Sequence, residues 1–294
     1  MKNILNLTFA ALALIAAGCS KESVEQETEQ ALAPVTVQVD GFAVSQGDMP
    51  DVTRGTAVAS YGSVTTLTLA FFKDDGTEAY NHNQLRADAS TYTTFGEFSL
   101  SLPIGSYTMV VIAYTGTVPF TLSSPTLATC GDERLQEVFV NKQTVNITST
   151  AAVNLSAALD RVIARLGVES TDVRTAGAVK LRTTFAKGGR NFNPSTGLAT
   201  TNTGFANTVS FSQAVGQTVS VASLLFLASD EQTMDVTLET LDADNNVLFT
   251  KTVNDVPLKR NRFTVLSGKL FSASATASSI TVNDSWLQGN SMDF

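Results

Sequence analysis

The sequence is poor in the residue types that carry most catalytic and metal chemistry. Its 294 residues include two cysteines, one tryptophan and one histidine. The lone His82 has no second imidazole with which to form a histidine-rich metal site, and no neighbours that complete a catalytic triad. Its polar surroundings, Tyr80 to Gln84, predict a solvated loop. We therefore expect no enzyme activity, no metal and no cofactor.

Positive charge is also scarce. Lys and Arg number 19 against 27 Asp and Glu, which gives a formal net charge of −8. No Lys/Arg cluster stands out, so nucleic acid is not an expected partner. Beyond the first twenty residues, no apolar run approaches the ~20 residues that a membrane-spanning helix needs.

Residues 1–18 have the organisation of a secretory signal peptide. Lys2 supplies the positive start, and an apolar stretch follows that is too short to span a bilayer. The segment Leu14 to Cys19 resembles the lipobox of bacterial lipoproteins, which implies cleavage before Cys19 and acylation of its thiol. Two acyl chains give stable anchoring where one does not. The alternative is an ordinary signal peptide that contains a cysteine. With Cys19 acylated, Cys130 has no disulfide partner within the mature chain, and we expect it to be a small buried side chain.

Residues 19–34 read as an acidic tether. Four glutamates and Lys21 leave almost nothing to bury, so the segment cannot offset its own ordering entropy. The start of the tether, Ser20-Lys21-Glu22, resembles the acidic export signals of surface lipoproteins in Bacteroides-type bacteria.

Strand patterns dominate the remaining chain. Val35 to Val44 begins with alternating apolar and polar residues, and Met234 to Leu241 repeats the pattern. Val64 to Phe72 and Tyr107 to Tyr114 are rich in β-branched and aromatic residues. Short strands separated by turn residues predict an all-β fold of two tandem β-sandwich domains. We place these domains at residues 35–155 and 156–294.

The segment around the predicted domain boundary has an ambiguous pattern. Leu155, Leu159, Val162 and Leu166 fit one face of a helix, whereas alternate residues from Val162 onward fit a strand. We expect a helical turn over residues 156–160 that leads into a strand.

One segment matches the EF-hand calcium-loop pattern only in part. Asp242, Asp244 and Asn246 have the spacing of the first EF-hand ligands, but Val247 and Val253 stand where the loop requires Gly and Glu. We expect a hairpin turn there.

Several segments, taken in order, resemble the fimbrillins of Bacteroidales, the shaft, tip and anchor proteins of fimbriae. They are Leu67 to Gly76, Leu100 to Tyr107, Leu159 to Leu166, Val256 to Phe271 and Ile280 to Trp286. The resemblance implies two transthyretin-like sandwiches and export to the outer membrane and cell surface as a lipoprotein. It also implies that a trypsin-like surface protease removes the first strand, and that a strand from another fimbrial subunit fills the groove.

Arg54 is the natural cleavage candidate, with the cut falling before Gly55. Residues 49–56 lack periodicity and contain Pro, Asp and Gly, which is typical of a protease-sensitive loop. Arg86, in another polar segment, is the second candidate. The alternative for Arg54 is an ordinary surface arginine.

The predicted donor strand is the C-terminal segment, residues 280–294. Its apolar residues alternate with polar ones, although Trp286 interrupts the pattern; they are Ile280, Val282, Leu287, Met292 and Phe294. The alternative is that this segment forms the last strand of its own domain.

Two further functions stay open. An anchor or tip subunit would not polymerise, and a surface glycan-binding lipoprotein would present aromatic platforms on exposed faces. Most of the 17 phenylalanines stand in apolar strand positions instead. The pattern therefore favours a polymerising subunit that serves cell adhesion.

Overall fold

The predicted all-β fold is confirmed by the computed structural model of the protein, which describes residues 30–42, 57–272 and the backbone of 279–283. Besides strands, these residues form two short 3₁₀ helices, η1 (Val58–Ser60) and η2 (Ala89–Thr91). The strands are β1 (Leu32–Phe42), β2 (Thr66–Lys73), β3 (Glu78–Leu85), β4 (Glu97–Pro103), β5 (Gly105–Tyr114), β6 (Thr121–Ser124), β7 (Leu127–Thr129), β8 (Val138–Ile147), β9 (Val153–Arg161), β10 (Ala164–Ser170), β11 (Lys180–Phe185), β12 (Phe192–Asn193), β13 (Leu198–Ala199), β14 (Phe205–Ser210), β15 (Ser220–Leu225), β16 (Glu231–Leu241), β17 (Val247–Lys259), β18 (Phe263–Gly268) and β19 (Ser279–Asn283).

The first sandwich is one continuous sheet folded on itself. Its strand order is β3-β2-β5-β8-β9-β1-β4. Strands β8 and β9 pair only at Phe139–Arg161 and Val140–Asp160, so the sheet divides there into two layers. Apolar residues from both layers, including Val37 and Leu69, form one core.

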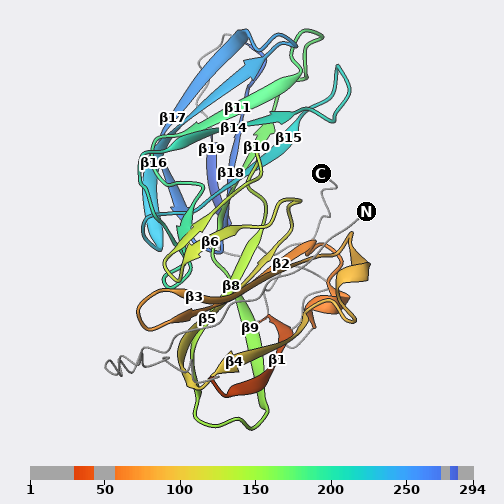
Figure 1. Ribbon diagram of the computed structural model, residues 1–294. Coiled ribbons are helices and arrows are strands. Elements are labelled where there is room, and N and C mark those ends of the chain that lie inside the picture. The colour runs from red at the N-terminus through yellow and green to blue at the C-terminus, as the bar shows by residue number, and fades with distance from the viewer. Residues whose placement is uncertain (1–29, 43–56, 273–278, 284–294) are drawn as a thin grey trace, which may run out of the picture. The chain divides into compact units, whose positions relative to one another are not determined.

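The second sandwich repeats the topology of the first. Its layers are β14-β11-β16-β17 and β15-β10-β18-β19, around a core of their own. Strand β10 is antiparallel to β15 and parallel to β18, as β1 is antiparallel to β4 and parallel to β9. Seven strands correspond in chain order, and β19 is an addition to the second sandwich. Figure 1 labels the strands of both groups.

The helical turn expected over residues 156–160 is wrong. Strand β9 runs through it, with Ala157, Leu159 and Arg161 buried and the residues between them exposed. Leucine spacing alone fits a helix as well as a strand, and pairing with β1 decides the outcome. The predicted domain boundary after residue 155 lies inside β9, and the repeated topology leads us to propose a division after Arg161.

A third core joins the two sandwiches. Strands β2 and β5 are buried on both faces, and their outer side chains, including Phe72 and Ile112, belong to an apolar cluster that also contains Leu224 of β15. Three rings, Phe120, Phe192 and Phe226, form its centre. The rings of Phe192 and Phe226 are stacked, with centroids 4.4 Å apart. The described residues from Ala31 onward therefore belong to one compact unit.

Some short or polar strands were not predicted. Strand β3 includes His82, so the expectation that this histidine lies in a loop is wrong, although its side chain is exposed as expected. The sequence of β3 lacks the apolar alternation of a strand because β3 is an edge strand and has little to bury. Pairing with the apolar β2 holds β3 in the sheet.

We predict that Phe192→Ala lowers the free energy of unfolding by about 3–5 kcal/mol, the usual cost of emptying a large aromatic site. Urea denaturation measures the change. Val215→Ala is the control, because Val215 is 54% exposed and its loss leaves no cavity. Equal effects of the two substitutions would contradict the description of the third core.

Candidate functional site

Strand β1 is the most distinctive element of the first sandwich because it is both N-terminal and central. It pairs with β4 from Leu32–Pro103 to Gln38–Glu97. On its other edge it pairs with β9 along nearly its whole length, with a bulge after Val39. Both hydrogen-bonding edges of β1 are therefore used, and β1 lies between β9 and β4 in the sheet.

The inner face of β1 completes the first core. Ala33, Val35, Val37 and Val39 are at most 1% exposed, and Phe42 is 2% exposed. Burying each larger apolar side chain stabilises the fold by ~1.5–3 kcal/mol. Without β1, the edges of β4 and β9 would be unpaired and the core between them open to water. An exposed edge of this kind readily pairs with another strand.

The predicted cleavage site follows β1 directly in the chain. Arg54 and Gly55 lie in residues 43–56, outside the described residues, as do residues 1–29 with Cys19. The chain is described again from Ala57, and η1 begins at Val58. The predicted cut therefore falls between β1 and the start of η1.

Arg86 holds the chain in place after the predicted cut. Its half-buried guanidinium lies 4.1 Å from the centre of the Phe95 ring. It donates hydrogen bonds to four carbonyl oxygens of segment 58–64, those of Val58, Ala59, Tyr61 and Val64, at 3.1, 3.2, 3.1 and 2.7 Å. Arg86 thus ties residues 58–64 to the sandwich through contacts that do not involve β1, in addition to the edge-on contact between the Tyr61 ring and Phe42 of β1, whose centroids lie 5.3 Å apart.

This geometry disfavours Arg86 as a second cleavage candidate. A trypsin-like protease must take the arginine side chain into its own pocket, and here that side chain is committed to four carbonyls. Sequence reasoning missed the role of Arg86 because its partners lie 22–28 residues earlier in the chain. No local pattern marks such a contact.

We predict that Arg86→Lys lowers the free energy of unfolding by about 2 kcal/mol. An ammonium group cannot reproduce the planar set of donors, and hydrogen bonds to charged groups contribute ~1.5–3 kcal/mol each before partial exposure is discounted. Thermal and urea unfolding measure the loss. Lys73→Gln, at an exposed position on β2, is the control. We call Arg86 with its four carbonyl partners the Arg86 clamp. An Arg86→Lys protein as stable as the wild type would contradict this role of Arg86.

The predicted donor segment is only partly described. Ile280 and Val282 belong to β19, which pairs antiparallel with β18 at the edge of the second sandwich. Trp286, Leu287, Met292 and Phe294 lie outside the described residues. For residues 279–283, the structure thus shows the last strand of their own sheet, and a donor role stays a prediction.

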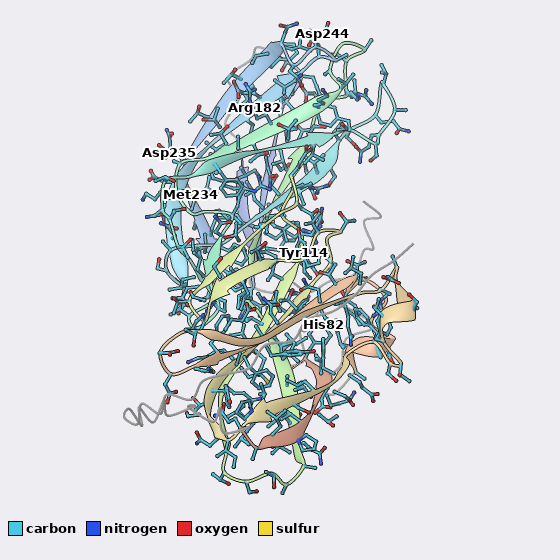
Figure 2. All side chains as sticks on the ribbon, in the orientation of Figure 1. His82, Tyr114, Arg182, Met234, Asp235 and Asp244 are labelled. Atoms are coloured by element: carbon cyan, nitrogen blue, oxygen red, sulfur yellow. The ribbon has the colours of Figure 1, made fainter. Side chains whose placement is uncertain are left out.

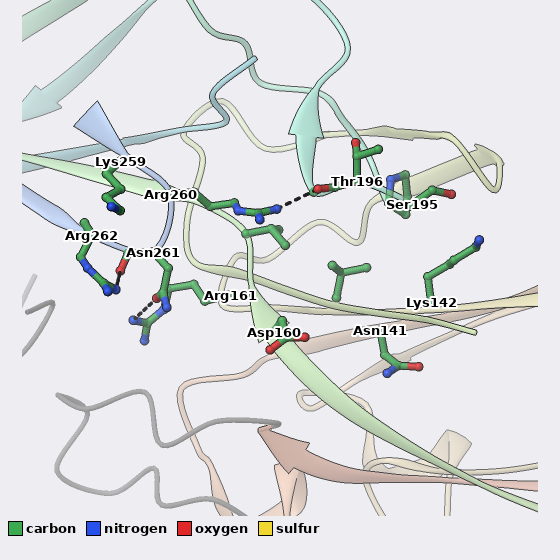
Figure 3. A pocket seen from close by; sticks show the side chains of 14 residues that line it. Asn141, Lys142, Asp160, Arg161, Ser195, Thr196, Lys259, Arg260, Asn261 and Arg262 are labelled. Carbon is green, nitrogen blue, oxygen red and sulfur yellow. Dashed lines mark hydrogen bonds between the residues drawn. The ribbon is translucent and has the colours of Figure 1, made fainter. Parts of the chain in front are cut away.

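A polar pocket of about 470 Å³ lies where β8 and β9 meet the β12–β13 and β17–β18 turns. Arg260 donates to the Thr196 carbonyl oxygen at 2.8 Å, and Arg161 to the Asn261 side-chain oxygen at 3.3 Å (Figure 3). The Asp160 residue reaches solvent, but partial desolvation of its carboxyl in the pocket raises the pKa of that group, and Arg260 opposes the rise.

The cations of this pocket are largely paired already. Arg260 lies 2.8 Å from an Asp230 oxygen, Lys259 contacts Glu231, and Arg161 lies 3.9 Å from Glu137. Such pairs leave little free positive charge for an anionic ligand. The pocket therefore serves best as a polar junction between the sandwiches.

Other chemical features are few in the described part of the chain. Within residues 30–42, 57–272 and 279–283, no group of three or more His, Cys, Asp or Glu side chains is placed to hold a metal. None of the helices found there is long and apolar enough to cross a membrane. Cys130 is half-buried rather than buried, with its sulfur 3.7 Å from the Asp132 carbonyl oxygen.

The fold defines the class of protein first: two tandem β-sandwiches of the same topology, the first completed by its own N-terminal strand. The chain belongs to the family described as "Family of unknown function (DUF6562)", which matches residues 35–291. No curated protein matches the chain.

Solved structures share this fold at low sequence identity. A crystal structure of a candidate adhesin from Bacteroides ovatus is 10% identical, with a TM-score of 0.51, and the match covers 89% of this chain and 97% of that one. A second candidate adhesin from Bacteroides ovatus is 12% identical, with a TM-score of 0.49 and coverage of 82% and 88%. The fimbrial anchor protein Mfa2 from Porphyromonas gingivalis is 10% identical, with a TM-score of 0.47 and coverage of 87% and 99%. The fold expected from the fimbrillin resemblance is confirmed.

Proposed function

We propose that this protein is a surface subunit of a fimbrial or adhesive assembly, exported as a lipoprotein and assembled by strand exchange after proteolysis. Its role is structural rather than enzymatic. Its partners are other subunits of the same or related kind, the membrane lipid that holds Cys19, and a trypsin-like protease that cuts before Gly55.

The observation that carries the proposal is the position of β1. It contributes five buried side chains to the core and pairs on both edges, yet it comes first in its sandwich. A cut after β1 would make that strand a separate peptide held by non-covalent contacts alone. A strand from another subunit with the same alternation of apolar side chains could then replace it.

The second sandwich provides an internal contrast. Its corresponding strand, β10, is joined to β9 by only two residues, Val162 and Ile163, both of which are buried. A protease has no exposed loop before β10, so the second sandwich cannot lose its central strand in the same way. Only the first sandwich combines a terminal central strand with a long following segment.

The Arg86 clamp supports the same mechanism. It holds segment 58–64 against the first sandwich through contacts that do not involve β1, so these contacts would remain after a cut at Arg54, although loss of β1 would remove the contact between the Phe42 and Tyr61 rings. Strand β19, at the edge of its sheet, contacts only β18 among the described strands of that sheet. An edge strand costs less to detach than a central one, which suits the donor role proposed for residues 280–294.

We predict that Arg54→Gln blocks both processing and assembly. Intact mass and N-terminal sequencing of the protein from surface fibres should give a start at Gly55 for the wild type. The variant should stay at full mature length, keep its lipid and form no ladder on unheated gels. Lys142→Gln, at an exposed position on β8, is the control and should be processed normally. A wild-type protein that begins at acylated Cys19 in every fraction would contradict the proposal and indicate an anchor-type subunit.

A further inference from the structure

A cleft opens where the two ends of the first sheet approach each other. Strands β3 and β4 are its terminal strands. Between them lies a cleft of about 530 Å³, lined by alternate residues of β3, by segment 91–94 and by residues 97–99 of β4. This volume is within the ~300–1,000 Å³ of small-molecule sites.

Gln84 fixes the width of the cleft at one end. Its side chain is 2% exposed, donates to the Glu97 carbonyl oxygen at 2.6 Å and accepts from the Gly96 amide at 2.8 Å. Gly96 has a φ of +96°, and an added Cβ would lie 2.6 Å from a Val58 methyl carbon. The two hydrogen bonds of the Gln84 side chain, which we call the Gln84 bridge, therefore connect β3 to the backbone at the start of β4. The conformation at Gly96 that permits them favours glycine.

Aromatic rings line the cleft. The His82 ring lies 6.3 Å from Tyr80 and 6.2 Å from Phe98, edge-on to the latter. Tyr80 and Tyr92 are half-buried, so each ring is held in the protein but also reaches solvent. The Tyr92 hydroxyl donates to the Arg86 carbonyl oxygen at 3.2 Å, which fixes its orientation. Figure 2 labels His82 on the first sandwich.

Polar groups form the rest of the lining. Hydroxyls come from Thr91, Thr93, Thr94 and Ser99, and the one carboxylate is the exposed Glu97. No Lys or Arg lines the cleft, and the chain carries a net charge of −8. These charges oppose an acidic ligand and suit a neutral one.

We propose that this cleft binds a neutral oligosaccharide. A pyranose ring has an apolar C–H face, which can lie against the Tyr80 and Tyr92 rings, and a rim of hydroxyls, which the threonine hydroxyls and the Glu97 carboxylate can bind. Pockets of this composition, aromatic with a few placed polar groups, are typical ligand sites. Hydrolysis of a glycosidic bond normally takes two carboxylates, and the lining has one, so the cleft binds without cleaving.

The proposal does not depend on strand exchange, since the cleft is present with β1 in place. The test is isothermal titration of the intact chain with cellohexaose, mannohexaose and xylohexaose, with hexagalacturonate as the acidic comparison. Glu97→Gln and His82→Ala remove exposed groups that line the cleft. Asn81→Ala is the matched control, because Asn81 is an exposed neighbour of His82 on β3 that does not line the cleft.

We expect saturable binding of at least one neutral hexasaccharide and none of hexagalacturonate. Glu97→Gln and His82→Ala should each weaken that binding at least tenfold at unchanged melting temperature, and Asn81→Ala should leave it unchanged. The proposal is overturned if no neutral hexasaccharide binds, if the acidic one binds as well, if the control weakens binding equally, or if the sugar is hydrolysed.

Discussion

The structure of the first sandwich depends on one strand that is central in the sheet and comes first among the described strands of the chain. Strand β1 supplies the hydrogen-bonding partners of both β4 and β9, together with the inner side chains that close the core. Backbone pairing and apolar burial therefore act at the same place. A strand with both contributions is costly to remove and equally favourable to replace, which is the physical basis of assembly by strand addition.

Duplication of the topology explains why the same strand position has different consequences in the two sandwiches. Strand β10 occupies the place of β1 but is continuous with β9 through buried residues, and it lies next to the third core. Phe120, from the first half of the chain, packs edge-on against the Phe192 and Phe226 rings of the second half, with centroids 5.5 and 6.3 Å away, and so helps to join the two halves. The exchange proposed for the first sandwich therefore would not require the second to open.

The sequence predicted the elements whose side chains alternate cleanly, such as β1 and β16, and the strongly apolar β5. The secondary-structure predictions were wrong where hydrogen bonding to a neighbouring strand, rather than burial of side chains, decides the conformation. Strand β3 is polar because it lies at a sheet edge, and the Leu159 segment fits a helix until its pairing with β1 is known. The Arg86 clamp and the Gln84 bridge depend on contacts distant in sequence, so no local pattern predicts them. The roles predicted for Cys19, Arg54, Gly55 and the donor segment 280–294 rest on sequence motifs and on the fimbrillin resemblance.

The central claim, that β1 is a replaceable strand, has a direct measurement. The protein is cut at Arg54 with trypsin and mixed with an excess of an isotopically labelled peptide of residues 30–54, and native mass spectrometry follows its incorporation. The account predicts that labelled peptide replaces the original segment in the cut protein and not in the intact one. If the cut protein keeps its original strand indefinitely, or if the intact protein takes up the peptide equally well, the account is contradicted.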